Sequence, residues 1–338
     1  MKISKHAWQR HLIHFDHVLH SNRTARRPAL ALYRNDLRTV LFRLEALARI
    51  YRVLEADHKL PRRSLVFFKS LEDALGQIDY FDNWQQMAIE HDWPAPMQIW
   101  FRERFEEALA EFENRLIQFK LLNKNGHLKP AGLQVWHKQL QRLPYHGQQK
   151  TLVQIADFLG RQSARLHKQY ASGRFNFHQI EDGLHEFRRR LRWLSIYVHS
   201  LNGMICLSSA DETRSDFTSF ITPESLASPF NQIQCDERLV ECLHFRRDLF
   251  FALGFLIGRL GQLKDKAQMR TALHEAILAS NLALPVELEQ TCRSLPGVQA
   301  IDLNIISSEA RQLCDEIILG KGLLLRIAEQ FPAVSQQA

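Results

Sequence analysis

Residues 34–52 read RNDLRTVLFRLEALARIYR, and residues 185–199 read HEFRRRLRWLSIYVH. Superposed on Asn35 and His185, the two stretches carry polar side chains, mostly arginine and histidine, at offsets 0, 3, 7, 10 and 14, with Phe42 as the one exception. At about 100° per residue these positions fall within a sector roughly 80° wide. Each stretch therefore predicts a helix with one mostly basic face about 21 Å long, suited to a long, flexible polyanion.

The composition of the 338-residue chain favours a helical protein with a large core. Hydrophobic residues make up 45% of it, while there are only 14 Gly and 11 Pro. These proportions favour helices over a turn-rich β fold. We therefore expect an all-α protein. No convincing strand alternation is present, and no apolar run is long enough to span a bilayer.

Basic residues are unevenly distributed along the chain. Residues 1–63 hold 14 Lys and Arg against 5 Asp and Glu, and residues 115–150 hold 7 against none, whereas residues 64–114 hold 3 against 11. Such segregation attracts anionic partners if the basic segments fold onto one side. The alternative is that these are ordinary solvated helix faces balanced by neighbouring acids.

Apolar residues at helical spacing predict the secondary structure, with Pro28 opening a long second helix that reaches Tyr51. Residues 208–236 lose this periodicity and are rich in Ser, Thr and Asp, so we expect a polar surface insertion there. The remaining helices are expected at residues 6–20, 65–84, 97–119, 133–143, 151–170, 177–201, 237–265, 267–280, 285–294 and 307–330.

A second short motif that occurs twice in the sequence favours an internal duplication. Leu75-Gly76-Gln77 follows the first basic helix, and Leu260-Gly261-Gln262 follows the second. We therefore expect two pseudo-repeated antiparallel bundles of about four helices each, related by a pseudo-twofold axis. Residues 1–135 would form the N-terminal half, and residues 136–338 the C-terminal half, which carries the polar insertion.

These residues resemble the CHAD domain, a conserved-histidine α-helical family. Its first motif is matched by Asn35-Asp36-Leu37-Arg38 with Arg43 and Leu44, followed by Lys69, Leu71, Leu75 and Gly76. Its second motif is matched by Leu184-His185-Glu186-Phe187-Arg188 with Arg192 and Leu194, followed by Leu260, Gly261 and Asp265. Asn35 stands where the family has its first histidine, and Phe42 and Glu45 replace two basic positions.

The resemblance implies binding of inorganic polyphosphate or a similar phosphate-rich polyanion in a basic groove between the two halves. Arginine suits such a ligand because its planar guanidinium group can donate two hydrogen bonds to one phosphate. Histidine would bind best when protonated. The candidate polyphosphate-binding residues are Arg34, Arg38, Arg43, Arg49, Arg52, Lys69, His185, Arg188, Arg192 and His199.

Structural roles are the alternative for several of these side chains. Arg38 and Arg188 could form internal ion pairs with Asp73, Asp79 or Asp265, and His185 could cap a helix or bond nearby backbone. The histidines of the first helix, His11, His14, His17 and His20, are three apart and cannot all share one ion, so a polar rim is expected there rather than a metal site.

Two other functions remain open besides polyphosphate binding. One is a helical scaffold that has lost much of the groove and binds a protein partner through residues 208–236. The other is nucleic-acid binding, which the charge favours but no recognised motif supports. No phosphate-binding glycine loop, nucleophile elbow or HExxH motif occurs, so we expect a non-enzymatic protein without a cofactor.

The five cysteines show no CxxC pairing and are odd in number. We expect them to be reduced, as in a cytoplasmic protein. The sequence begins without an apolar signal core. These features predict a cytoplasmic location, with association with polyphosphate granules as a further implication of the family resemblance.

Overall fold

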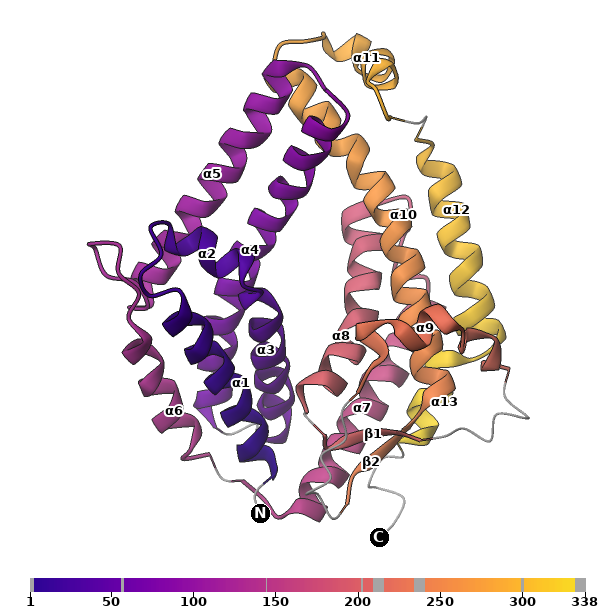
Figure 1. Cartoon of the computed structure of the whole chain (residues 1–338). Coiled ribbons are helices and arrows are strands. Elements are labelled where there is room, and N and C mark those ends of the chain that lie inside the picture. The colour runs from indigo at the N-terminus through magenta and orange to yellow at the C-terminus, as the bar shows by residue number, and fades with distance from the viewer. Residues whose placement is uncertain are drawn as a thin grey trace. The chain divides into compact units, whose positions relative to one another are not determined.

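The computed structural model describes residues 3–55, 58–143, 145–201, 203–208, 216–233, 241–298 and 301–331 (Figure 1). Helices make up most of these residues, which confirms the helical class that the composition predicts. The expectation of a purely α-helical chain was wrong, because two short strands pair in a small parallel sheet.

The chain divides into two compact units. The N-terminal unit comprises the described residues of 8–143 and 268–301, and the C-terminal unit those of 3–7, 145–267 and 302–331. The predicted boundary after residue 135 lies eight positions before Leu143 (143 minus 135), where the first long segment of the N-terminal unit ends. A single cut does not separate the units, because residues 268–301 return to the first of them.

The N-terminal unit is built around a long antiparallel hairpin of α4 and α5 (Figure 1). Buried aromatic residues fill its core; Trp8, for example, has its ring centroid 6.3 Å from that of Phe68. The helices of this unit are α1 (Ile3–Ser21, from residue 8 onward), α2 (Pro28–Arg34), α3 (Leu37–Leu54), α4 (Lys59–Glu90), α5 (Ala95–Gln118), α6 (Gln134–Leu140) and α11 (Leu288–Ser294).

The long helix expected from Pro28 is broken into α2 and α3. Pro28 does occupy the first turn of α2, as predicted. Asp36 then adopts a left-handed conformation, with φ of 54°, and its Oδ1 accepts a hydrogen bond from Thr39 Oγ1 at 2.7 Å. Short Asp side chains tolerate this conformation better than most residues, so the helix ends and restarts there.

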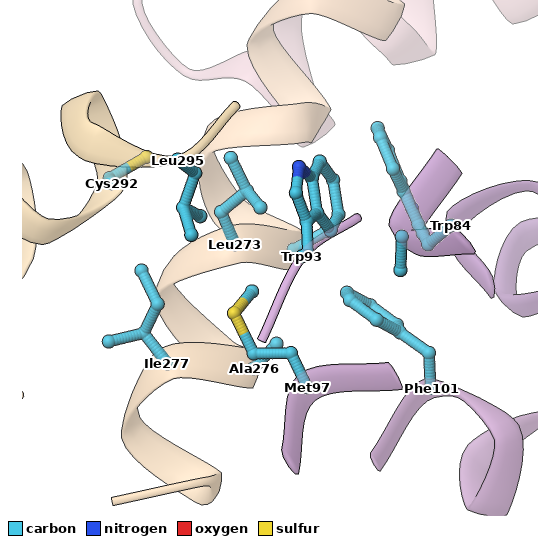
Figure 2. Close-up of a cluster of buried hydrophobic side chains, with 11 residues drawn as sticks. Trp84, Trp93, Met97, Phe101, Leu273, Ala276, Ile277, Cys292 and Leu295 are labelled. Carbon is cyan, nitrogen blue, oxygen red and sulfur yellow. The ribbon is translucent and has the colours of Figure 1, made fainter. Parts of the chain in front are cut away.

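A cluster of buried apolar side chains joins the tip of the α4–α5 hairpin to the end of α10 (Arg247–Ala279) and to α11 (Figure 2). Trp93 and Phe101 come from the hairpin, while Leu273 comes from α10. Trp93 Nε1 donates a hydrogen bond to the Pro296 carbonyl oxygen at 2.9 Å. This cluster explains why residues 268–301 belong to the N-terminal unit. The predicted break near residue 266 was wrong, because α10 is continuous.

The C-terminal unit contains α7, α8, the first part of α10 and a C-terminal helical segment. Gly160 on α7 lies against the C-terminal segment, and a Cβ there would come within 2.2 Å of the Phe331 carbonyl oxygen. The helices are α7 (Gln148–Ala171), a π-helix (Ile180–His185), α8 (Glu186–Ser200), α9 (Pro223–Ala227), α12 (Leu303–Cys314), a second π-helix (Asp315–Gly320) and α13 (Leu323–Gln330).

The two strands are β1 (Ile205–Ser208) and β2 (Leu243–Arg246), paired in parallel from Ile205 opposite Leu243 to Ser208 opposite Arg246. The helix predicted from residue 237 was therefore wrong over β2. Each strand has only four residues, too few for alternation of polar and apolar side chains to stand out.

The polar insertion is ordered where it is described, over residues 216–233. It contains α9, which begins with a capping box between Thr222 and Ser225. Phe217 is buried, whereas Phe230 is 74% exposed. The segment is thus anchored by one aromatic side chain and presents another to solvent. Residues 209–215 and 234–236 of the predicted insertion lie outside the described residues.

The cysteines do not all stay reduced, contrary to expectation. Cys206 on β1 is disulfide-bonded, while Cys242, Cys292 and Cys314 are free thiols. Cys235 lies outside the described residues. Over the described residues, no helix combines the length and the apolar character needed to cross a membrane.

Candidate anion-binding faces

Arg38 lies in the first turn of α3 and reaches α4. Its Nε donates to Glu72 Oε1 at 3.0 Å, and its Nη1 donates to Asp79 Oδ2 at 2.5 Å. The guanidinium group lies over Gly76, where a Cβ would be 2.9 Å from Nη2. Two carboxylates therefore hold this arginine, and the pairing with Asp79 is the internal one that the sequence allowed.

Arg49 and Lys69 also form ion pairs within the N-terminal unit. Arg49 donates through Nε and Nη2 to Glu45 Oε1, at 2.9 and 2.6 Å. Burial raises the pKa of Glu45, and the Arg49 charge opposes that shift. Lys69 Nζ lies 2.5 Å from both carboxylate oxygens of Asp73. A polyanion binding to either cation would have to compete with its carboxylate partner.

The other candidates of this unit differ in exposure. Arg34 at the end of α2 and Arg52 near the end of α3 are exposed, and neither forms an ion pair with the described part of the chain. Arg43 is partly buried on α3. Burial lowers its pKa, Asp36 opposes this shift, and the nearby Arg10 adds to it. None of these three arginines lines the cavity of this unit that Arg23, Arg26 and Arg27 line.

Asn35, at the position of the family's first histidine, has a structural role. Its Nδ2 donates to Asn22 Oδ1 at 3.0 Å and to the Ala31 carbonyl oxygen at 2.8 Å. Asn22 is itself buried and donates to the Val18 carbonyl oxygen at 2.7 Å. Asn35 thus ties the end of α2 to the loop that follows α1.

Arg188 on α8 is held against α10 without a carboxylate. Its Nε donates to the Ile257 carbonyl oxygen at 3.1 Å. A Cβ on Gly261 would lie 3.0 Å from both Nε and Nη2 of the guanidinium group. Burial lowers the pKa of Arg188, and Asp265 opposes that shift. Arg188 forms no ion pair with any described residue, so it keeps donors for an external anion.

His185 precedes Arg188 on the same face, at the junction of the π-helix and α8. Its Nδ1 lies 3.8 Å from Glu181 Oε2, and its side chain makes no capping hydrogen bond at the start of α8, which excludes helix capping as its role. Burial lowers its pKa, Glu181 opposes the shift, and Lys264 and Arg188 add to it. Several cations therefore lie close to this imidazole ring.

The other two candidates continue along α8. Arg192 is half-buried. His199 Nε2 lies 2.9 Å from the carbonyl oxygen of Phe230, and its ring centroid is 6.0 Å from that of Phe250. The polar insertion therefore touches the far end of the basic face. His185 and Arg188 lie at the opposite end of this face, at the start of α8, from the contact between His199 and Phe230.

Arg38 and Arg188 share one geometry but differ in charge environment. Each packs over a helix glycine, Gly76 or Gly261. Four residues before the glycine, Arg38 finds the Glu72 carboxylate, whereas Arg188 finds only the Ile257 carbonyl oxygen. The packing is similar, but Arg38 is neutralised in the N-terminal unit, whereas Arg188 forms no ion pair with the described residues of the C-terminal unit.

Three residues after the glycine, the N-terminal unit has an acidic residue and the C-terminal unit has a basic one. Asp79 occupies this position in the N-terminal unit and pairs with Arg38. Lys264 occupies it in the C-terminal unit, where its Nζ pairs with Asp265. Counting only these charges, one cation meets two anions around Arg38, whereas two cations meet one anion around Arg188. The charges that surround Arg188 are therefore more positive than those that surround Arg38.

Sequence reasoning missed Glu72 and Lys264. The spacing from Gly76 and Gly261 could have revealed both, because residues three and four apart on a helix lie on one face. The hydrogen bond from Arg188 to the Ile257 carbonyl oxygen could not be predicted from the sequence, because every residue has a backbone carbonyl group.

No family model matches the chain, and the comparisons with curated proteins and with solved structures also find no match.

Proposed function

We propose that the chain binds inorganic polyphosphate, or a similar phosphate-rich polyanion, without catalysing a reaction on it. The C-terminal unit would supply the main contacts through His185, Arg188 and Arg192, with His199 at the end of the face. The resemblance to the CHAD domain supports the choice of ligand. The proposal also includes an internal duplication, of which Arg38 over Gly76 and Arg188 over Gly261 would be the remnant.

The observation that carries the proposal is the state of Arg188. Its guanidinium group is fixed by a single backbone carbonyl oxygen at 3.1 Å and has no carboxylate partner among the described residues. A guanidinium group has five N–H donors, and one of them is used here. The remaining donors suit the bidentate hydrogen bonding that a phosphate group favours.

The N-terminal unit would make weaker contacts with a polyanion. Arg38, Arg49 and Lys69 already have carboxylate partners in this unit. Replacing a carboxylate by a phosphate exchanges one anion for another and breaks the existing ion pair. Of the predicted residues, Arg34 and Arg52 are exposed, form no ion pair with the described residues and would attract the polyanion through their charge alone.

A titration with labelled long-chain polyphosphate tests the proposal, using wild type, Arg188→Ala, Arg38→Ala and Arg165→Ala. Arg165 is exposed on α7, so its variant removes the same charge from an unrelated surface. We expect Arg188→Ala to weaken binding about fivefold to tenfold at low salt, and the other two by less than about twofold. If six phosphate contacts form, the wild-type slope of log K against log salt is about −4.

Equal losses in all three variants, or no binding at about 50 mM salt, would refute the proposal. Single-stranded RNA added as a competitor separates polyphosphate binding from nucleic-acid binding. Displacement of polyphosphate by an equal concentration of RNA phosphate would favour the nucleic-acid alternative.

A second candidate function is protein binding through the polar insertion. The observation favouring it is Phe230, which is 74% exposed while its carbonyl oxygen faces His199 Nε2. An exposed aromatic side chain on an anchored segment is typical of an interface. A pull-down with wild type and Phe230→Ser tests this function. A partner retained equally by both would rule out this role for Phe230.

A further inference from the structure

A cavity of about 650 Å³ opens in the N-terminal unit, and none of its lining residues belongs to the proposed polyphosphate site. One wall is the loop of residues 23–27, which leads into α2. The second wall is α5, through Leu109 and Glu113, and the third is the loop of residues 125–128. Its volume is in the range of pockets that hold a small organic molecule.

The wall made by residues 125–128 is held in shape by Asn123. Asn123 Oδ1 accepts hydrogen bonds from the backbone N–H groups of Asn125 and His127, each at 2.9 Å. Between them Gly126 has φ of +76°, a conformation that favours glycine. A wall that is ordered before binding costs less conformational entropy when a ligand arrives.

The wall made by residues 23–27 is anchored at both ends. Asn22, just before it, bonds Val18 and is bonded by Asn35, as described above. Arg27, at its end, forms an ion pair with Glu106 on α5. The segment between these anchors carries Arg23 and Arg26, and neither forms an ion pair with the residues that the structure describes.

The charges of this cavity select an anion. Arg23 and Arg26 line it against one carboxylate, Glu113, because the Arg27 charge is already balanced by Glu106, and the His127 ring adds a hydrogen-bonding group. Arginine pairs of this kind suit a phosphate group, which accepts several hydrogen bonds at once. The cavity therefore offers cations to a phosphate while keeping one acceptor for a hydroxyl or amino group.

The cavity also has an apolar part, which a bare phosphate ion would leave empty. Ala25, Leu30, Leu109 and Leu128 line it, and Ala25 and Leu30 keep part of their surface accessible. Pockets for small molecules commonly combine apolar walls with a few polar groups that fix orientation. We propose that the cavity binds a small organic phosphate, a phosphate monoester with a ring or aliphatic body.

Calorimetric titration of the full chain with three probes tests the proposal: phenyl phosphate, adenosine monophosphate and inorganic phosphate. We expect the two esters to bind at least about tenfold more tightly than inorganic phosphate, because only they fill the apolar part. The double variant Arg23→Ala/Arg26→Ala should weaken ester binding about tenfold or more.

The matched control is Arg62→Ala/Arg63→Ala, which removes two exposed arginines from the first turns of α4. It should leave ester affinity within about twofold of wild type. Equal losses in both double variants, or no ester binding at millimolar concentration, would overturn the proposal. Polyphosphate affinity is measured on the same samples, so that failure of this site is distinguished from failure of the proposed function.

Discussion

Arg188 lies so close to Gly261 that a Cβ on the glycine would be 3.0 Å from both Nε and Nη2 of the guanidinium group. The arginine is therefore positioned by the absence of a side chain on α10 as much as by its hydrogen bond to Ile257. A cation held in this way does not need a carboxylate to keep its place, which leaves its charge available.

Gly261→Ala should displace Arg188 and weaken polyphosphate binding about threefold to tenfold. The reason is steric, since the new methyl group and the guanidinium group cannot both keep their positions. Gly76→Ala is the matched variant, because its Cβ would be 2.9 Å from Arg38 Nη2. It should leave polyphosphate affinity nearly unchanged. A larger loss of polyphosphate affinity in Gly76→Ala than in Gly261→Ala would place the main contact in the N-terminal unit and contradict the proposal.

Arg38→Ala should lower the free energy of unfolding by about 1–3 kcal/mol, because it removes a charged hydrogen bond to the largely buried Glu72 carboxylate. The Glu72 side chain is only 9% exposed, whereas that of Asp79 is 56% exposed and can be solvated. Urea unfolding of Arg38→Ala, Glu72→Gln and the double variant measures the coupling. Strictly additive effects of the two substitutions would show that the pair contributes nothing.

Much of the helical layout could be predicted from sequence, but its breaks could not. Apolar periodicity predicted the helices around Leu41 and Leu191, and spacing allowed the ion pair between Arg38 and Asp79. The end of α2 depends on the left-handed conformation of Asp36, which competes with a helical pattern on both sides. β2 begins 35 residues after the end of β1 (243 minus 208), and only the fold brings the two strands together.

The candidate site was less predictable than the helices that carry it. Its residue types were visible in the periodic arginines and histidines. The sequence did not show which of these residues are neutralised, because this depends on neighbours from another helix. Arg38 meets Glu72 there, while Arg188 meets a backbone oxygen that has no signature in the sequence.

Polyphosphate binding should strengthen as the pH falls below the usual imidazole range, about 6.5, because His185 gains a charge. Burial lowers the pKa of His185, so the gain begins below that range in the free protein. His185→Ala should flatten this part of the pH profile. Titrations from pH 5 to pH 8, about the range in which histidine titrates, measure the effect. An unchanged profile would exclude His185 as the titrating contact.

The same histidine should make the free protein less stable in acid. Its folded-state pKa is lowered, so the unfolded chain binds the proton more tightly and stability falls as the pH drops below the unfolded value. His185→Ala should therefore lose less stability than wild type between pH 7 and pH 5, about the interval over which the unfolded imidazole titrates. Thermal unfolding without ligand measures this difference.

Gly160→Ala should destabilise the C-terminal unit by about 1–3 kcal/mol, because a Cβ there would meet the Phe331 carbonyl oxygen at 2.2 Å. Gly258→Ala on α10 is the matched control, since a Cβ at Gly258 meets nothing within 4 Å. It should stabilise the helix by about 0.5–1 kcal/mol. Denaturant unfolding of both variants distinguishes a packing effect from helix propensity, and equal changes would contradict the close approach.

The apolar cluster that joins the α4–α5 hairpin to α10 also sets an order of events during synthesis. Phe101 is made 172 residues before Leu273 (273 minus 101), although both belong to the cluster. At about 5–20 residues per second, the ribosome needs roughly 9–34 s to cover that distance. Throughout this time Trp93 and Phe101 lack their partners from α10. The N-terminal unit, although most of its residues are made first, is therefore completed only after most of the C-terminal unit has been made.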